Sequence, residues 1–197
     1  MRFRVSSLSY SLIVAVVWTI LYNGGLWSFL SRLPWASGVG QAFFLVTFFF
    51  FLVGALTLLL SLISFRGLLK PVVVILTLTN ASASYFMQKY SIVFDPGMIR
   101  NIVETDLREA LGLMTWGWAL YVLALGVLPS VLLALIPIQW RDWKRQWIWR
   151  MGGVATGLAL IGGVAAVAYQ EYASVFRNHR EVRYYILPTS YSYYLVR

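Results

Sequence analysis

The stretch QAFFLVTFFFFLVGALTLLLSLI, residues 41–63, decides the fold class of this chain. It is almost wholly apolar, and no charged residue lies between Arg32 and Arg66. A helix needs about 20 residues to cross a hydrocarbon core about 30 Å thick. The stretch is therefore long enough and apolar enough to be a transmembrane helix.

Four further apolar runs flank this stretch on both sides. The run over 68–90 is the most polar of them, but its small polar side chains can form hydrogen bonds with neighbouring helices. The sequence thus predicts an all-α membrane protein, a bundle of five transmembrane helices within residues 1–170. The expected spans are 9–30, 41–63, 68–90, 116–138 and 152–169.

Composition supports a membrane protein and excludes several other classes. Hydrophobic residues make up 60% of the 197 residues, charged residues only 12%, and mean hydropathy is +0.73. Soluble domains are about half apolar and about a quarter charged. The chain has no cysteine, so it has neither a disulfide nor a thiol nucleophile. The net charge of +9 lies beside apolar runs, which indicates anionic lipid headgroups and not nucleic acid.

The distribution of lysine and arginine predicts the orientation. Basic residues crowd the short segments before the first span, between spans two and three, and between spans four and five, a pattern typical of the cytoplasmic side. Most acidic residues lie in the segments on the other side. We therefore expect a cytoplasmic amino terminus, with the loop between spans three and four and the carboxy-terminal tail both facing outward.

The spans themselves carry few signs of chemistry. No charged residue lies near the middle of any of them, which disfavours a secondary transporter. Gly126, Pro129 and Pro137 predict a structural kink in the fourth span more than a functional break. In the fifth span, Gly153 and Gly157 are four residues apart and Gly162 and Gly163 follow about two turns later. These glycines predict a close-packing face that serves contact within the chain more than dimerisation.

The loop after the third span holds a segment with helical periodicity. Asp95 and Pro96 are typical of a helix start, as the N-cap and the first helical residue. Asn101, Thr105 and Glu109 follow at spacings of four, which brings them onto one face of a helix lying near the membrane interface. This row is either a solvated face or a polar cradle for a lipid headgroup, in which Glu109 meets an ammonium group.

Three stretches of the chain resemble the lipid A phosphoethanolamine transferases, a family that includes the mobile colistin-resistance enzymes. Residues 84–110 read SYFMQKYSIVFDPGMIRNIVETDLREA and match the family's segment after the third span, including the Asn-Thr-Glu row. Residues 125–130, LGVLPS, and 172–183, YASVFRNHREVR, match as well. Ser91 stands where a glycine is common, and Val175 replaces a frequent phenylalanine.

The resemblance implies a two-part enzyme of the bacterial inner membrane. A periplasmic domain with zinc and a threonine nucleophile would move phosphoethanolamine from phosphatidylethanolamine to lipid A. We expect this chain to be the membrane domain alone, with no catalytic residue and no metal, and inactive without its partner domain. Residues matching Asn101, Thr105 and Glu109 would help to bind the donor headgroup. The alternative is a structural anchor that touches bilayer lipids only nonspecifically.

The tail, residues 171–197, is rich in tyrosine and arginine. We expect an interfacial helix and then an extended connector toward the catalytic domain, or else a frayed end. Arg177, Arg180 and Arg183 are candidates to contact lipid phosphates, although simple snorkelling to the interface explains them equally well. His179, the chain's one histidine, lies among these arginines and is a headgroup-level residue more than a metal ligand.

Overall fold

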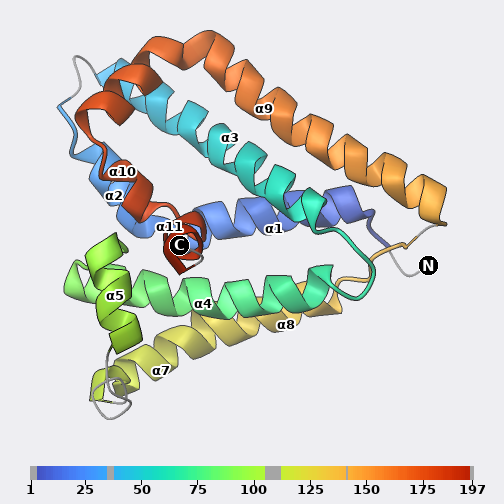
Figure 1. The fold of residues 1–197 in the computed structure, drawn as a ribbon, viewed down its shortest axis with the longest axis horizontal. Helices are drawn as coiled ribbons and strands as arrows, with labels where there is room; N and C mark the ends of the chain where they lie inside the picture. The colour runs from blue at the N-terminus through green and yellow to red at the C-terminus, as the bar shows by residue number, and fades with distance from the viewer. Residues whose placement is uncertain (1–3, 35–37, 105–111, 141, 196–197) are drawn as a thin grey trace.

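A computed structural model describes residues 4–34, 38–104, 112–140 and 142–195, and within these ranges the chain is helical (Figure 1). Its one β feature there is an isolated bridge between Val5 and Ile138. The helices are α1 Ser7–Leu21, α2 Gly24–Ser31, α3 Gly38–Leu62, α4 Leu69–Tyr90, α5 Pro96–Glu104, α7 Trp116–Val122, the π-helical η1 Leu123–Val127, α8 Leu128–Leu135, α9 Trp143–Asn178, α10 Val182–Tyr185 and α11 Thr189–Leu195.

Within the described ranges, four helical runs are long and apolar enough to cross a membrane: α3, α4, the continuous run α7–η1–α8, and α9. Helices α1 and α2 together make a fifth, bent by 58° between its two halves. The predicted all-α membrane fold is therefore confirmed, with α5 as a separate helix between the third and fourth spans.

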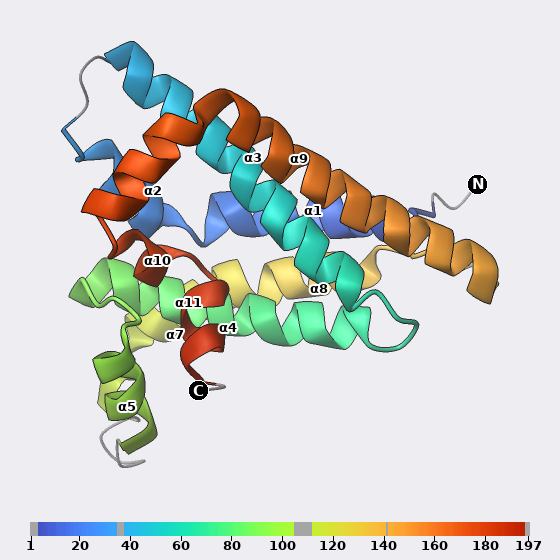
Figure 2. The same ribbon diagram turned by 45° about the horizontal axis from the view of Figure 1, so that its top comes forward.

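Helix α1 occupies the centre of the bundle. It lies between α3 and α9 on one side and α4 on the other, and contacts all three (Figures 1 and 2). Its large side chains Tyr10, Trp18 and Tyr22 are at most 1% exposed and form the middle of the core. The Trp18 indole donates a hydrogen bond of 2.9 Å to the Thr77 hydroxyl of α4, so a polar group of the third span does face a neighbouring helix.

The span expected over residues 9–30 is broken at Asn23. The Asn23 backbone leaves the helical region, at φ −96° and ψ 26°, and Gly24 and Gly25 follow it. Its buried side chain joins the two sides of the break, because its amide donates to the Trp18 carbonyl at 3.1 Å. The Tyr22 N–H donates to the same carbonyl at 3.2 Å, so the last turn of α1 keeps its helical bond and gains a second donor.

The expected kink in the fourth span is a π-helical turn just before Pro129. Proline has no backbone N–H, so the carbonyl four residues earlier, that of Leu125, lacks its normal donor. The Tyr22 hydroxyl supplies one, at 2.6 Å. The break in the first span and the bulge in the fourth are thereby joined by a hydrogen bond.

Helices α3 and α9 approach closely through glycines. A Cβ on Gly157 would lie 2.7 Å from the Gly54 carbonyl oxygen and 2.7 Å from the Leu58 Cβ, and one on Gly153 would overlap the Ser61 side chain. For Gly153 and Gly157 the predicted packing face is thus confirmed as a contact within the chain. For Gly162 and Gly163 the prediction is wrong, because nothing described lies within 4 Å of either Cβ position.

Helix α9 is longer than the span expected over residues 152–169. It runs from Trp143 to Asn178 with one non-helical residue, Ala168, at φ −132° and ψ 22°. The first residues of the expected tail segment therefore belong to α9. Beyond it the chain folds back over the bundle as α10 and α11 (Figure 2). Residues 189–195, expected as an extended connector or a frayed end, form a helix instead.

Candidate functional site

The helix bundle has two ends. The N-terminal end is where α1, α4 and α9 begin, at the right of Figure 1, and the α5 end is where α4 and α9 finish and α5 and α10 lie, at the left. Residues 84–104, the described part of the stretch that resembles the family's segment after the third span, lie at the α5 end.

Helix α5 begins as the sequence predicts. The Met98 backbone N–H donates to the Asp95 carboxylate at 2.7 Å, which satisfies one of the free donors of the first turn. Pro96 is the first helical residue. Arg100 and Glu104 form an exposed ion pair at 3.7 Å, which contributes at most about 1 kcal/mol. The cap, and not this pair, fixes where the helix starts.

The structure describes only one of the three residues of the predicted polar row. Asn101 lies on α5 with its side chain exposed. Thr105 and Glu109 lie outside the described residues. The expected meeting of the three side chains therefore stays a prediction.

Arg177, Arg180 and Arg183 are all exposed, at the end of α9, in the turn after it and in α10. The Arg183 guanidinium donates to the Tyr184 hydroxyl at 2.9 Å. His179 lies 3.5 Å from the Glu181 carboxylate, between Nδ1 and Oε1, and its ring meets Phe29 edge-on. Within the described ranges no group of three His, Asp or Glu side chains comes together as a metal site would require.

A cavity of about 420 Å³ opens at the α5 end, between α2, the end of α4 and α10. Arg32 supplies a positive charge in it, and Gln88 and Ser28 supply polar groups. Guanidinium is suited to bidentate contact with phosphate. The sequence analysis missed this cavity, although Asn23-Gly24-Gly25 within an apolar run was a signal. The lining residues are Gly24, Gly25, Ser28, Phe29, Arg32, Met87, Gln88, Ser91 and Tyr185.

Hydrogen bonds hold the Gln88 side chain at the edge of this cavity. Its amide donates to the Ser84 hydroxyl at 2.9 Å and to the Tyr121 hydroxyl at 3.1 Å. The Tyr85 hydroxyl lies 3.1 Å from that of Thr115. Ser84 and Tyr85, two residues of the matching motif, thus join the end of α4 to the residues at the start of the fourth span.

A second cavity at the same end, of about 430 Å³, lies between α2 and the end of α9. Glu171 and His179 face it, so it offers a carboxylate where the first cavity offers a guanidinium. A zwitterionic headgroup carries both a phosphate and an ammonium group. The α5 end therefore contains polar groups that complement each of them.

The tail helps to build this end. Leu187 N–H donates to the Asn23 side-chain oxygen at 2.9 Å, and the Tyr191 hydroxyl donates to the Asn80 side-chain oxygen at 2.8 Å. Burial raises the pKa of Tyr191 well above its ordinary value, so its phenol stays a neutral donor. Helix α11 contacts α5, and the Tyr191 ring meets Phe94 edge-on at 6.2 Å between centroids. The tail therefore supports the loop that leads into α5.

Comparison with known proteins gives one family. Residues 52–197 match the family model described as phosphoethanolamine transferase EptA/EptB. The chain is 35% identical to phosphatidylethanolamine transferase Mcr-2 of Escherichia coli over 145 residues, 74% of this chain and 27% of the relative. It is also 35% identical to phosphatidylethanolamine transferase Mcr-1 of Escherichia coli, over 79% of this chain and 28% of that one.

One solved structure has the same fold. The integral membrane protein lipooligosaccharide phosphoethanolamine transferase A (EptA) from Neisseria meningitidis superposes with a TM-score of 0.90 at 24% identity. The match covers 98% of this chain and 36% of that one. The chain spans about a quarter to a third of the relatives and the structure that it matches.

Proposed function

Because this chain belongs to the phosphoethanolamine transferase EptA/EptB family, we propose that it is the membrane domain of an enzyme that moves phosphoethanolamine from phosphatidylethanolamine to lipid A. In this proposal it anchors a periplasmic, zinc-dependent catalytic domain and helps to bind the donor headgroup. The chain alone would not catalyse transfer, because the nucleophile and the zinc ligands are expected in the partner domain.

The chain is a multi-pass membrane protein, and we place it in the bacterial inner membrane. We further propose that the N-terminal end is cytoplasmic and that the α5 end is periplasmic. Basic residues support this orientation, since they accumulate in the cytoplasmic segments of membrane proteins. Those of the segments expected inside are Arg2, Arg4, Arg66, Lys70, Arg141, Lys144, Arg145 and Arg150.

The observation that carries the donor-binding proposal is the position of α5. The helix is capped by Asp95, lies across the end of the bundle and exposes Asn101. Asn101 and Thr105 would meet phosphate or glycerol oxygens, and Glu109 would meet the ammonium group. Arg32 and Gln88 of the neighbouring end of the bundle offer further phosphate-binding groups. Arg177, Arg180 and Arg183 would contact phosphates of surrounding lipids.

The test is the transfer activity of the full-length protein that contains this domain. We expect Asn101→Ala, Thr105→Val and Glu109→Gln each to lower kcat/KM by about tenfold or more, the loss of one charge-assisted hydrogen bond. Glu104→Gln is the matched control, because it makes the same change as Glu109→Gln at an exposed carboxylate of α5. Arg177→Gln, Arg180→Gln and Arg183→Gln should each have smaller effects.

Full activity of all three row variants, at normal expression, would contradict the headgroup role and leave the chain as a structural anchor. Equal losses in Glu104→Gln and Glu109→Gln would also contradict it, because the effect would then come from the loss of one negative charge in this segment and not from Glu109 itself.

A further inference from the structure

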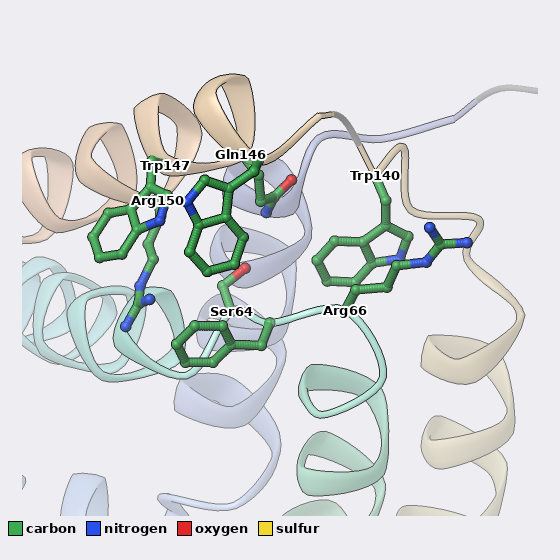
Figure 3. A pocket seen from close by; sticks show the side chains of 8 residues that line it. Ser64, Arg66, Trp140, Gln146, Trp147 and Arg150 are labelled. Atoms are coloured by element: carbon green, nitrogen blue, oxygen red, sulfur yellow. The ribbon is translucent and has the colours of Figure 1, made fainter.

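A third cavity lies at the N-terminal end, remote from the donor site. It has a volume of about 160 Å³ and forms between the α3–α4 loop, the α8–α9 loop and the first turns of α9 (Figure 3). This is about five times the share of liquid volume of one water, about 30 Å³. It can hold a headgroup fragment but not a whole lipid. Its lining residues are Ser64, Phe65, Arg66, Trp140, Trp143, Gln146, Trp147 and Arg150.

The walls of this cavity are aromatic. Its lining includes Trp140 of the α8–α9 loop and Trp147 of α9 (Figure 3), together with Trp143 of α9 and Phe65 of the α3–α4 loop. Trp143 is 69% exposed and Trp147 is 40% exposed, so both rings are available to lipid. Indole rings are typical of the boundary between the hydrocarbon and the headgroups. The cavity therefore lies at the depth of lipid phosphates in a bilayer.

Two arginines line the cavity, on opposite sides of it (Figure 3). The Arg150 guanidinium is held in place, because its central carbon lies 4.1 Å from the centroid of the Phe65 ring and 4.9 Å from that of Trp147. It also donates to the Leu62 carbonyl at the end of α3. Arg66 is exposed on the loop and extends beside Trp140 (Figure 3). Among the residues that the structure describes, no carboxylate lines the cavity, so within that part of the chain neither charge has an anionic partner there.

Two buried polar atoms at this cavity have no hydrogen-bond partner among the described residues: the Ser64 hydroxyl and the Arg150 Nε. Ser64 is only 2% exposed, and its hydroxyl is directed toward the space between Gln146 and Trp140 (Figure 3). An unsatisfied buried polar group is costly, so such a group in a folded protein calls for an explanation. Ser64 lines the cavity, so a small movement of its neighbours would let a bound anion accept a hydrogen bond from its hydroxyl.

We propose that this cavity binds the phosphodiester of an anionic lipid from the leaflet at the N-terminal end. In this proposal the phosphate lies against the exposed guanidinium of Arg66, Arg150 adds positive charge from the other side of the cavity, and the lipid's glycerol and first chain carbons lie on the indole rings. Basic pockets between helices on the cytoplasmic side are suited to such lipids. A zwitterionic lipid fits less well, because its ammonium group would meet two cations and no carboxylate. The proposal concerns the end opposite the donor site and is independent of the donor-binding proposal.

The test is lipid binding to the purified protein, measured by native mass spectrometry in detergent with added phosphatidylglycerol, phosphatidylcholine or inorganic phosphate. We expect phosphatidylglycerol to bind well above phosphatidylcholine. Arg66→Gln should weaken phosphatidylglycerol binding about tenfold, the loss of one charge-assisted hydrogen bond. Ser64→Ala should weaken it by a smaller factor. Arg145→Gln is the matched control, since Arg145 lies in the same first turns of α9 but does not line the cavity.

Three results would overturn the proposal. Equal binding of phosphatidylcholine and phosphatidylglycerol would remove the anion preference. Equal losses in Arg66→Gln and Arg145→Gln would show general attraction to a basic surface. Binding of inorganic phosphate that depends on Arg66, without binding of phosphatidylglycerol, would assign the cavity to a free anion and not to a lipid.

Discussion

Helices α3 and α9 meet through glycines, whereas the tail meets α1 and α4 through buried amides and hydroxyls. At the first contact, Gly54, Gly153 and Gly157 let two backbones approach, and dispersion over the close surfaces holds them. At the second, Asn23 and Asn80 accept hydrogen bonds from Leu187 and Tyr191. In lipid, apolar burial does not drive helices together. The two contacts are stabilised in other ways: the first by the close fit of two backbones, the second by hydrogen bonds between buried polar groups.

The largest effect is expected at the glycine contact. Gly157→Leu should destabilise the protein by about 3 kcal/mol or more, because its Cβ alone would lie 2.7 Å from a backbone oxygen that cannot move away. Unfolding in detergent, followed by circular dichroism, measures it. Gly162→Leu, on the same helix with nothing within 4 Å, should be close to neutral. Equal effects at the two positions would mean that the close approach is not what stabilises this contact.

The next effect is expected at Asn23, on the polar side of the comparison. Asn23→Ala should cost about 2 kcal/mol, because it leaves the buried Leu187 N–H without its acceptor and removes one of the two donors to the Trp18 carbonyl, which keeps the Tyr22 N–H. The same unfolding experiment measures it, and limited proteolysis of the tail should become faster. Asn178→Ala, an exposed asparagine at the end of α9, is the control and should change little. A neutral Asn23→Ala would mean that the tail is held by apolar contact instead.

The smallest effect is expected at Tyr191. Tyr191→Phe keeps the ring against Phe94 and removes only the hydroxyl bonded to Asn80, so a loss of about 1 kcal/mol is expected. Tyr169→Phe, at a tyrosine that is 72% exposed, should be neutral. A loss at Tyr191 as large as that at Asn23 would show that the two polar contacts act as one cooperative network.

The sequence was sufficient for features that depend on local pattern. Apolar runs without charge predicted the membrane fold, Asp95-Pro96 predicted the start of α5, and the spacing of Gly153 and Gly157 predicted a packing face. Each follows from residues close together in the chain, whose helical geometry is known in advance.

Features that depend on distant partners could not be predicted in this way. The break at Asn23 is stabilised partly by Leu187, 164 residues away, and no periodicity reveals such a pairing. The helix over 189–195 depends on a surface formed by other elements. The cavity with Arg32 and Gln88 likewise forms only when α2, α4 and α10 come together. Of the predicted headgroup residues, Asn101 is placed on α5, and the roles of Thr105 and Glu109 stay predictions.

The hydrogen bonds between Asn23 and Leu187 also set an order of events during synthesis. Asn23 enters the membrane early, but the backbone groups that complete its bonding belong to a residue made 164 positions later. At about 5–20 residues per second, the ribosome needs roughly 8 to 33 s to reach it. Until then the first span carries an incompletely satisfied amide in the lipid. The domain can reach its final fold only after Leu187 has left the ribosome, so docking of the tail is the step that completes folding of the bundle.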